Sequence, residues 1–287
     1  MKKHKICKIL LVILAIFLCV AFYELLGICV AYKKQPEVSN TTKKETKNGS
    51  WNECSENTER AVIIEKNPEA LLQRVRLIKN AKKEIILSTF AFQSDESGKL
   101  ILGALHDAAD RGVHIRLLVD GMESWIDMEG NPYFYGLSSH ENVEIKLYNK
   151  ANPLKPWKMM GRMHDKYLIA DGKRYILGGR NTYNYFLGDF PGHKNYDRDV
   201  LVVCDEPEKE NSVNQLLEYF ETIWEQEDSG YFHDNKKLAN RKSVKNAVLE
   251  LKNGYQKYFE ENKERICDTD YTDETFETEK IALVSNP

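Results

Sequence analysis

The chain has 287 residues, of which 42% are hydrophobic and 30% charged, so it can bury the core of one ordinary domain or of two small ones. Its formal net charge is −3, which excludes the overall basic excess that is typical of nucleic-acid-binding domains. The six cysteines include no CxxC pair, so the sequence indicates no zinc site.

Residues 1–34 are predicted to anchor the chain in a membrane. The apolar run from Ile9 to Tyr32 is long enough to cross a bilayer as one helix. Glu24 lies toward one end of this run, where placing an acidic side chain in the membrane costs less free energy than at its centre. A cleaved signal peptide is the alternative, although no small-x-small cleavage site is evident. The lysines before the run favour a cytoplasmic N-terminus, which predicts a single-pass protein of the cell membrane with its body outside the cytoplasm.

Residues 35–58 are polar and aperiodic, which predicts a flexible linker. Strands then alternate with helices over residues 59–226, and this alternation indicates an α/β domain in which helices pack on a sheet. The expected strands up to residue 150 are Ala61–Glu65, Glu84–Phe92, Val113–Val119 and Val143–Leu147. The helices expected between them start at Asn67 and at Ser97.

The residues with the clearest chemistry begin at His164. Residues 163–170 are predicted to form a strand, and Asp171-Gly172 is a strong hairpin signal. Side chains two apart on a strand share a face, so His164 and Lys166 are expected to point the same way, roughly 7 Å apart. A strand from Arg174 to Leu177 would return alongside.

The returning strand leads to Gly178-Gly179, where the main chain can approach a ligand closely, and then to Asn181, whose amide can hydrogen-bond an oxyanion. The hairpin therefore brings an imidazole, an ammonium and an amide around one small volume. Such a set of groups suits a phosphate.

The pattern His164-x-Lys166-x-x-x-x-Asp171, followed by a glycine pair and Asn181, resembles the HKD signature of the phospholipase D superfamily. The usual Gly-Ser of that family is Gly178-Gly179 here, which loses a hydroxyl. Three further stretches look like the first half of bacterial cardiolipin synthases, and they are Leu105–Gly121, Tyr148–Trp157 and Phe220–Trp224. The resemblance implies an α/β/α sandwich, with a mixed sheet flanked by helices, preceded here by one transmembrane helix.

The resemblance also implies phosphodiester transfer through a covalent phosphohistidine, without a metal or cofactor. His164 would be the nucleophile or the leaving-group acid, and Lys166 and Asn181 would hold the phosphate oxygens beside the glycine pair. Asp171 belongs to the signature, but its place at the hairpin turn favours a structural role. Asp199 is expected to orient the imidazole, with Asp197 as the alternative.

Basic residues gather in sequence around the motif and form either a funnel for an anionic substrate or solvated loops; they are Lys155, Lys158, Arg162, Lys173, Arg174, Arg180, Lys194 and Arg198. After them, an amphipathic helix with apolar residues from Val213 to Trp224 is expected to close the domain. Cys204 is expected to be buried, and a Cys54–Cys267 disulfide is compatible with an extracytoplasmic body.

Residues 227–287 are expected to form a charged extension, helical around Val244–Phe259 and otherwise irregular. Its last residues, Ile281–Pro287, would open a second repeat that is missing from the chain. Because in-line displacement needs an acid opposite the nucleophile, a single motif is expected to require a second one, from a symmetric dimer or from a missing half.

Three functions are compatible with these features. The first is a membrane-anchored enzyme that transfers phosphatidyl groups between phospholipids, similar to cardiolipin synthase or phospholipase D. The second is a homodimeric single-motif nuclease of the same superfamily, and the third is an inactive half that binds lipid or a partner. The apolar N-terminal run favours phospholipid and membrane over nucleic acid as the partner.

Overall fold

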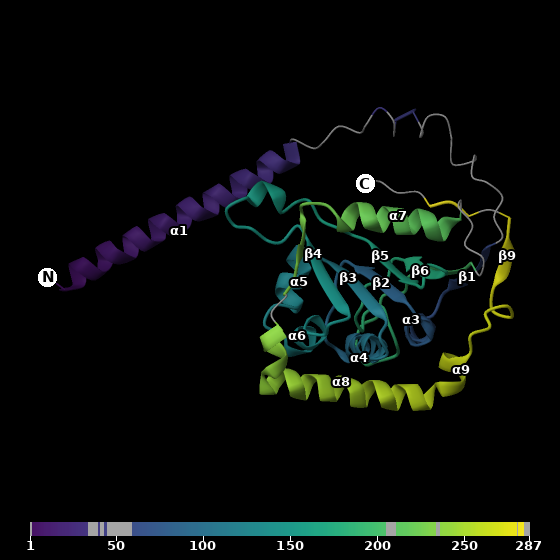
Figure 1. The fold of residues 1–287 in the computed structure, drawn as a ribbon. Helices are drawn as coiled ribbons and strands as arrows, with labels where there is room; N and C mark the ends of the chain where they lie inside the picture. Colours follow the sequence, from purple (N-terminus) through teal and green to yellow (C-terminus); the bar gives the residue numbers. More distant parts are fainter. Residues whose placement is uncertain are drawn as a thin grey trace.

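The computed structural model describes residues 2–33, 40, 43–44, 59–204, 211–233, 236–279 and 281–283. Most of the expected linker, together with Cys54 and residues 284–287, lies outside this part of the chain. Helix α1 (Lys2–Lys33) projects away from the body of the molecule (Figure 1). Within the described residues, one helix is long and apolar enough to cross a bilayer, and its apolar stretch runs from His4 to Ala31.

Nine strands form one mixed sheet in the described residues, in the order β8-β4-β3-β2-β5-β6-β7-β1-β9. Strands β2, β3 and β4 pair in parallel, and all other neighbours pair antiparallel. The strands are β1 (Glu59–Ile64), β2 (Glu84–Thr89), β3 (His114–Asp120), β4 (Val143–Tyr148), β5 (Lys166–Ala170), β6 (Arg174–Gly178), β7 (Asp199–Val203), β8 (Ser229–Tyr231) and β9 (Phe276–Thr278).

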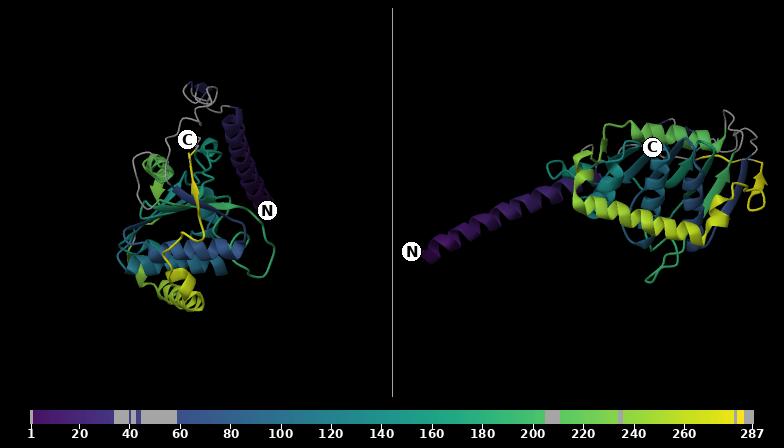
Figure 2. Two further views of the ribbon diagram at one scale, coloured as in Figure 1. Left: turned by 90° about the vertical axis from the view of Figure 1, so that its right-hand side faces the viewer. Right: turned by 60° about the horizontal axis from the view of Figure 1, so that its bottom comes forward.

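Helices cover both faces of the sheet, as the sequence predicted (Figures 1 and 2). On one face lie α3 (Asn67–Asn80), α4 (Glu96–Asp110) and α6 (Pro132–Ser138), and on the other lies α7 (Ser212–Trp224). The apolar core is divided accordingly, with one cluster under α3, α4 and α6 and a second one under α7. Cys204 is buried in the second cluster. The fold is an α/β/α sandwich.

Local sequence explains where the helices begin. The Asp95 carboxylate accepts the Gly98 N–H at the start of α4, and the Asn211 side chain accepts the Asn214 N–H at the start of α7. Pro68 stands in the first turn of α3, where its missing N–H costs no hydrogen bond. Three further helical segments are short: α5 (Gly121–Asp127) and the 3₁₀ turns η2 (Pro156–Lys158) and η3 (Lys236–Asn240).

The residues after 226, which we expected to form a charged extension, complete the same sheet at both of its edges. Strand β8 pairs with β4, β9 pairs with β1, and α8 (Lys242–Glu261) crosses over α4 and α6. The described end of the chain, residues 281–283, is not in a strand; Ile281 and Leu283 pack against the cluster under α7, and the Leu283 N–H donates to Gln215.

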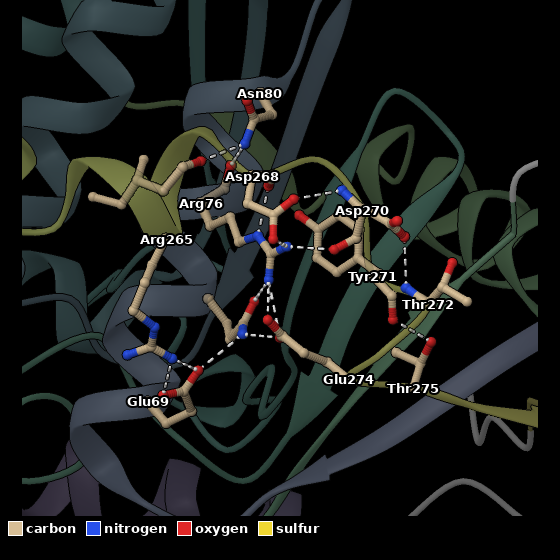
Figure 3. A network of polar contacts seen from close by, with 12 residues as sticks. Glu69, Arg76, Asn80, Arg265, Asp268, Asp270, Tyr271, Thr272, Glu274 and Thr275 are labelled. Atoms are coloured by element: carbon tan, nitrogen blue, oxygen red, sulfur yellow. Dashed lines mark hydrogen bonds and ion pairs between the residues drawn. The ribbon is translucent and has the colours of Figure 1, made fainter.

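Arg76 of α3 fixes the segment between α8 and β9 (Figure 3). Its guanidinium donates to the Asp268 and Asp270 carbonyls, pairs with the Glu274 carboxylate at 2.9 Å, and lies 4.0 Å from the centre of the Tyr271 ring. Short α9 (Lys263–Cys267) precedes these contacts, and the Asn80 amide caps it by donating to the Ile266 carbonyl. The C-terminal segment is therefore bound to the helix layer as part of one fold.

Candidate functional site

The pairing of β5 with β2 places the motif at one end of the sheet. Lys166 lies opposite Thr89, so Phe90, the next residue, stands beside the start of β5. The His164 ring packs edge-on against Phe90 with 4.6 Å between ring centres, and the Lys166 ammonium lies 5.3 Å from the centre of the same ring. Lys166 is buried and donates to the His164 carbonyl at 2.7 Å. The imidazole and the ammonium therefore share one aromatic wall.

This environment favours a neutral imidazole. Partial burial lowers the pKa of His164 and the positive charge of Lys166 lowers it further, while the Asp165 carboxylate opposes both effects. Burial also lowers the pKa of Lys166, against the opposing effect of Asp165 and Asp197. A neutral ring nitrogen can attack an electrophile, so near neutral pH His164 is in the form that a nucleophile needs.

Asn181 completes the set of groups around Phe90. Its side chain is buried, and its Oδ1 accepts the N–H of Ala91, the residue after Phe90, at 3.2 Å. The same side chain hydrogen-bonds Tyr183. These contacts tie the amide to the end of β2, next to the residue that His164 and Lys166 share as a wall.

The glycine pair has a tertiary reason that the sequence did not reveal. A Cβ on Gly178 would overlap the Asp199 carboxylate and the Arg198 carbonyl, and a Cβ on Gly179 would overlap the Asp197 carboxylate. Each glycine thus makes room for an acidic side chain, Asp199 at the start of β7 or Asp197 just before it. We expected the main chain to approach a ligand closely at these positions; instead, another part of the same chain packs closely against them.

Asp199 does not have the surroundings that we expected. Its carboxylate is fully buried and its Oδ2 lies 2.8 Å from Arg74 of α3 and 3.3 Å from Arg180. Arg180 also donates to Asn67 Oδ1 and to the carbonyls of Ile64 and Glu65. The Asp199 carboxylate therefore compensates two buried cations and stabilises the turn before Asn181. It pairs with these arginines and not, as we expected, with the His164 imidazole.

Asp197, the alternative carboxylate, lies nearer to the motif. It is half-buried, stands against Gly179, and its negative charge acts on the Lys166 ammonium. The signature residue Asp171 is at the other end of the hairpin, roughly 16 Å along the strand from Lys166. The Asp171 carboxylate accepts the N–H groups of Lys82, Lys83 and Glu84 where β2 begins, and these are the contacts of a structural residue.

Sequence reasoning missed two residues at this end of the sheet, Phe90 and Asp120. Phe90 forms the wall; the sequence placed it inside the expected strand Glu84–Phe92, whereas β2 ends at Thr89. Asp120, fully buried at the end of β3, accepts from Arg162 Nε at 2.9 Å and from the Met163 N–H at 3.1 Å. Arg162 in turn lies 4.9 Å from the Phe90 ring, so Asp120 fixes the chain immediately before His164.

Ion pairs and buried hydrogen bonds hold several members of the basic cluster. Arg180 pairs with Asp199, Arg162 with Asp120 and Glu123, Lys158 with Asp228, and Arg198 with Glu65. At the motif itself, the Lys166 ammonium supplies positive charge beside the neutral His164 ring. Among the residues that the structure describes, no group of three or more His, Cys, Asp or Glu side chains is arranged to hold a metal ion.

Comparisons with known proteins agree with this fold. The family model described as "Cardiolipin synthase, PLD-like domain" matches residues 74–224. An uncharacterized protein of Helicobacter pylori strain J99 is 30% identical over 212 residues, which is 69% of this chain and 39% of that protein. Cardiolipin synthase C of Escherichia coli K12 is 29% identical over 171 residues, which is 55% of this chain and 34% of that protein. The chain thus matches well under two thirds of the length of these relatives.

Among solved structures, the phosphatidylserine synthase of Haemophilus influenzae matches with a TM-score of 0.51 and 17% identity, over 77% of this chain and 48% of that one. A likeness at this identity concerns the fold alone. Because the family model covers more than half of the chain, including the HKD hairpin and both flanking helix layers, the chain belongs to the cardiolipin synthase-type, phospholipase D-like family.

Proposed function

We propose that this chain catalyses phospholipase D-type phosphodiester transfer on phospholipids, in the manner of a cardiolipin synthase or a phospholipase D. The observation that carries the proposal is that His164 and Lys166 pack against Phe90 at one end of the sheet, while the Asn181 amide is hydrogen-bonded to the next residue, Ala91. Membership of the family supports the reaction class, and the apolar helix α1 supports a lipid substrate.

In this mechanism the neutral His164 ring attacks the phosphorus, a nitrogen–phosphorus bond forms, and the bond to the leaving alcohol breaks. The Lys166 ammonium and the Asn181 amide donate to the non-bridging oxygens, where negative charge increases in the transition state. An acceptor alcohol or water then releases the phosphatidyl group from the imidazole. We assign Asp197 the role of orienting the imidazole, because both arginine contacts of Asp199 hold that carboxylate elsewhere.

The leaving alcohol needs a proton from the side opposite His164, and a second HKD motif would supply it. A second copy of this chain or a further HKD half are the two sources. We further propose that α1 is an uncleaved single-pass anchor in the cell membrane and that the α/β body lies outside the cytoplasm. This arrangement keeps the site beside its lipid substrate and leaves nucleic acid as the less favoured partner.

The test is lipid turnover by full-length protein, alone and mixed with a second-motif half, in vesicles that contain phosphatidylglycerol. We expect His164→Ala to remove turnover by at least about 10²–10⁴-fold. His114→Ala is the matched control, since His114 is a half-exposed histidine on β3 that pairs with Glu84 and Glu144. We expect turnover to persist in EDTA. An active His164→Ala protein would refute the mechanism, and cleavage of DNA without lipid turnover would replace the function by that of a nuclease.

A further inference from the structure

Two neighbouring segments expose large apolar side chains beside the motif end of the sheet. Leu154, Trp157 and Met160 belong to the loop of residues 149–161 and are 78%, 45% and 50% exposed. Trp125 and Ile126 on α5 are 64% and 65% exposed. Single exposed apolar residues are normal on protein surfaces, but a group of five of them, including two tryptophans, marks an interaction surface.

The loop that presents these side chains is held in shape by its own hydrogen bonds. The Asn149 amide donates to the Gly161 carbonyl at 2.6 Å and to the Lys158 carbonyl, which closes the two ends of the loop. The Lys158 ammonium pairs with Asp228 at 2.7 Å. Helix α5 adjoins this loop, because a Cβ on Gly121 would overlap the Asn149 carbonyl. The loop is thus ordered, and α5 begins beside it.

Helix α1 contacts this loop (Figure 1). The Tyr23 hydroxyl donates to the Leu154 carbonyl at 2.8 Å, and Gly27, one helical turn later, lies against Pro156 without room for a Cβ. The apolar stretch of α1 ends at Ala31, so these contacts lie roughly 6–12 Å before its end at 1.5 Å per residue. In a membrane-spanning helix that depth is the boundary between acyl chains and headgroups, where tryptophan is enriched.

We propose that the loop of residues 149–161 is a membrane-docking loop, which inserts Leu154, Trp157 and Met160 into the headgroup boundary of the bilayer that α1 crosses, with Trp125 and Ile126 beside it. The proposal rests on the proposed anchoring by α1. A bilayer is the occupant because the helix seated on the loop would end at that depth, and exposed Lys155 on the loop suits anionic headgroups.

The docking loop also has a direct connection to the catalytic motif. Gly161, at its end, is followed by Arg162 and Met163, which Asp120 holds, and then by His164. Insertion of the loop would therefore fix the height of the imidazole above the lipid surface. Such a connection gives phospholipids in the same bilayer an advantage over dissolved phosphodiesters.

Quenching of tryptophan fluorescence by brominated acyl chains tests the insertion directly. Full-length protein is reconstituted in vesicles of phosphatidylcholine and phosphatidylglycerol, with or without bromine on the lipid tails. We expect Trp157→Phe to lose part of the quenched signal. Adding Leu249→Trp to that variant should not restore it. Leu249 is 60% exposed, but it lies on α8, on the opposite side of the sheet from α7, so a tryptophan there would face away from the bilayer. Unchanged quenching in Trp157→Phe, or its restoration by Leu249→Trp, would overturn the proposal.

A second measurement separates this proposal from the proposed function. Leu154→Asp places a charge at the tip of the loop, and we expect the ratio of vesicle-lipid turnover to turnover of bis(4-nitrophenyl) phosphate to fall. An unchanged ratio in an active protein would contradict docking. If the protein turns over neither substrate but Trp157 is quenched, the enzymatic proposal fails and docking stands. Release of the protein from vesicles by high salt would overturn docking together with the anchor.

Discussion

Replacement of Asp199 by asparagine should damage the stability of the fold more than the chemistry of His164. The Asp199 and Arg180 side chains are both 0% exposed and that of Arg74 is 4% exposed, so this carboxylate is the charge that compensates two buried guanidinium groups. Asn keeps the shape but removes the charge. Breaking a buried ion pair in this way costs about 3–5 kcal/mol, because the remaining cations are left without compensation.

This free energy corresponds to a fall of about 6–20 °C in the thermal midpoint, at about 2–4 °C per kcal/mol for a domain of this size. The assay is a thermal melt of full-length protein in detergent at one fixed scan rate. Asp197→Asn is the matched control, since Asp197 is only half-buried and lies outside the buried Asp199–arginine network, where a single change shifts stability by about 0.5 kcal/mol. For Asp197→Asn we expect a normal melt and reduced turnover.

The opposite pattern would refute this reasoning. If Asp199→Asn melted with the wild type but lost turnover, and the acid limb of its pH–rate profile shifted, then Asp199 would act on the imidazole in the functional state. A normal pH–rate profile in an active Asp197→Asn protein would remove Asp197 from the orienting role.

Three further changes have defined outcomes. Asp171→Ala should destabilise the protein by about 1–3 kcal/mol in a urea titration, because three N–H groups at the start of β2 lose their acceptor. Gly178→Ala should lower the thermal midpoint more than Gly172→Ala, since its Cβ would overlap the backbone of Arg198 as well as Asp199, whereas Gly172 strains only a turn. Burial lowers the pKa of His106, so the unfolded chain takes up this proton first and stability should decrease as the pH falls below about 6.5; His106→Gln should flatten that slope in melts across pH.

The local pattern of the sequence was sufficient to predict most elements of the fold. The strands around the motif and the helices α3, α4, α7 and α8 lie within a few residues of the expected ranges, because alternation and helical periodicity record which side of each element is buried. The expected strand before the hairpin began three residues too early, since β5 starts at Lys166. His164 instead lies in the segment that Asp120 holds.

Only the tertiary structure decided the partners of the charged residues. Asp199 and Arg74 are 125 residues apart in the sequence, and no periodicity relates a strand to a helix across that distance. For the same reason the sequence did not reveal that Phe90 lines the site, since this depends on the register of β2 against β5. Nor did it reveal the two edge strands that residues 227–279 add to the sheet. Sequence spacing determined which groups of the motif share a hairpin; long-range packing determined which carboxylate remained beside them.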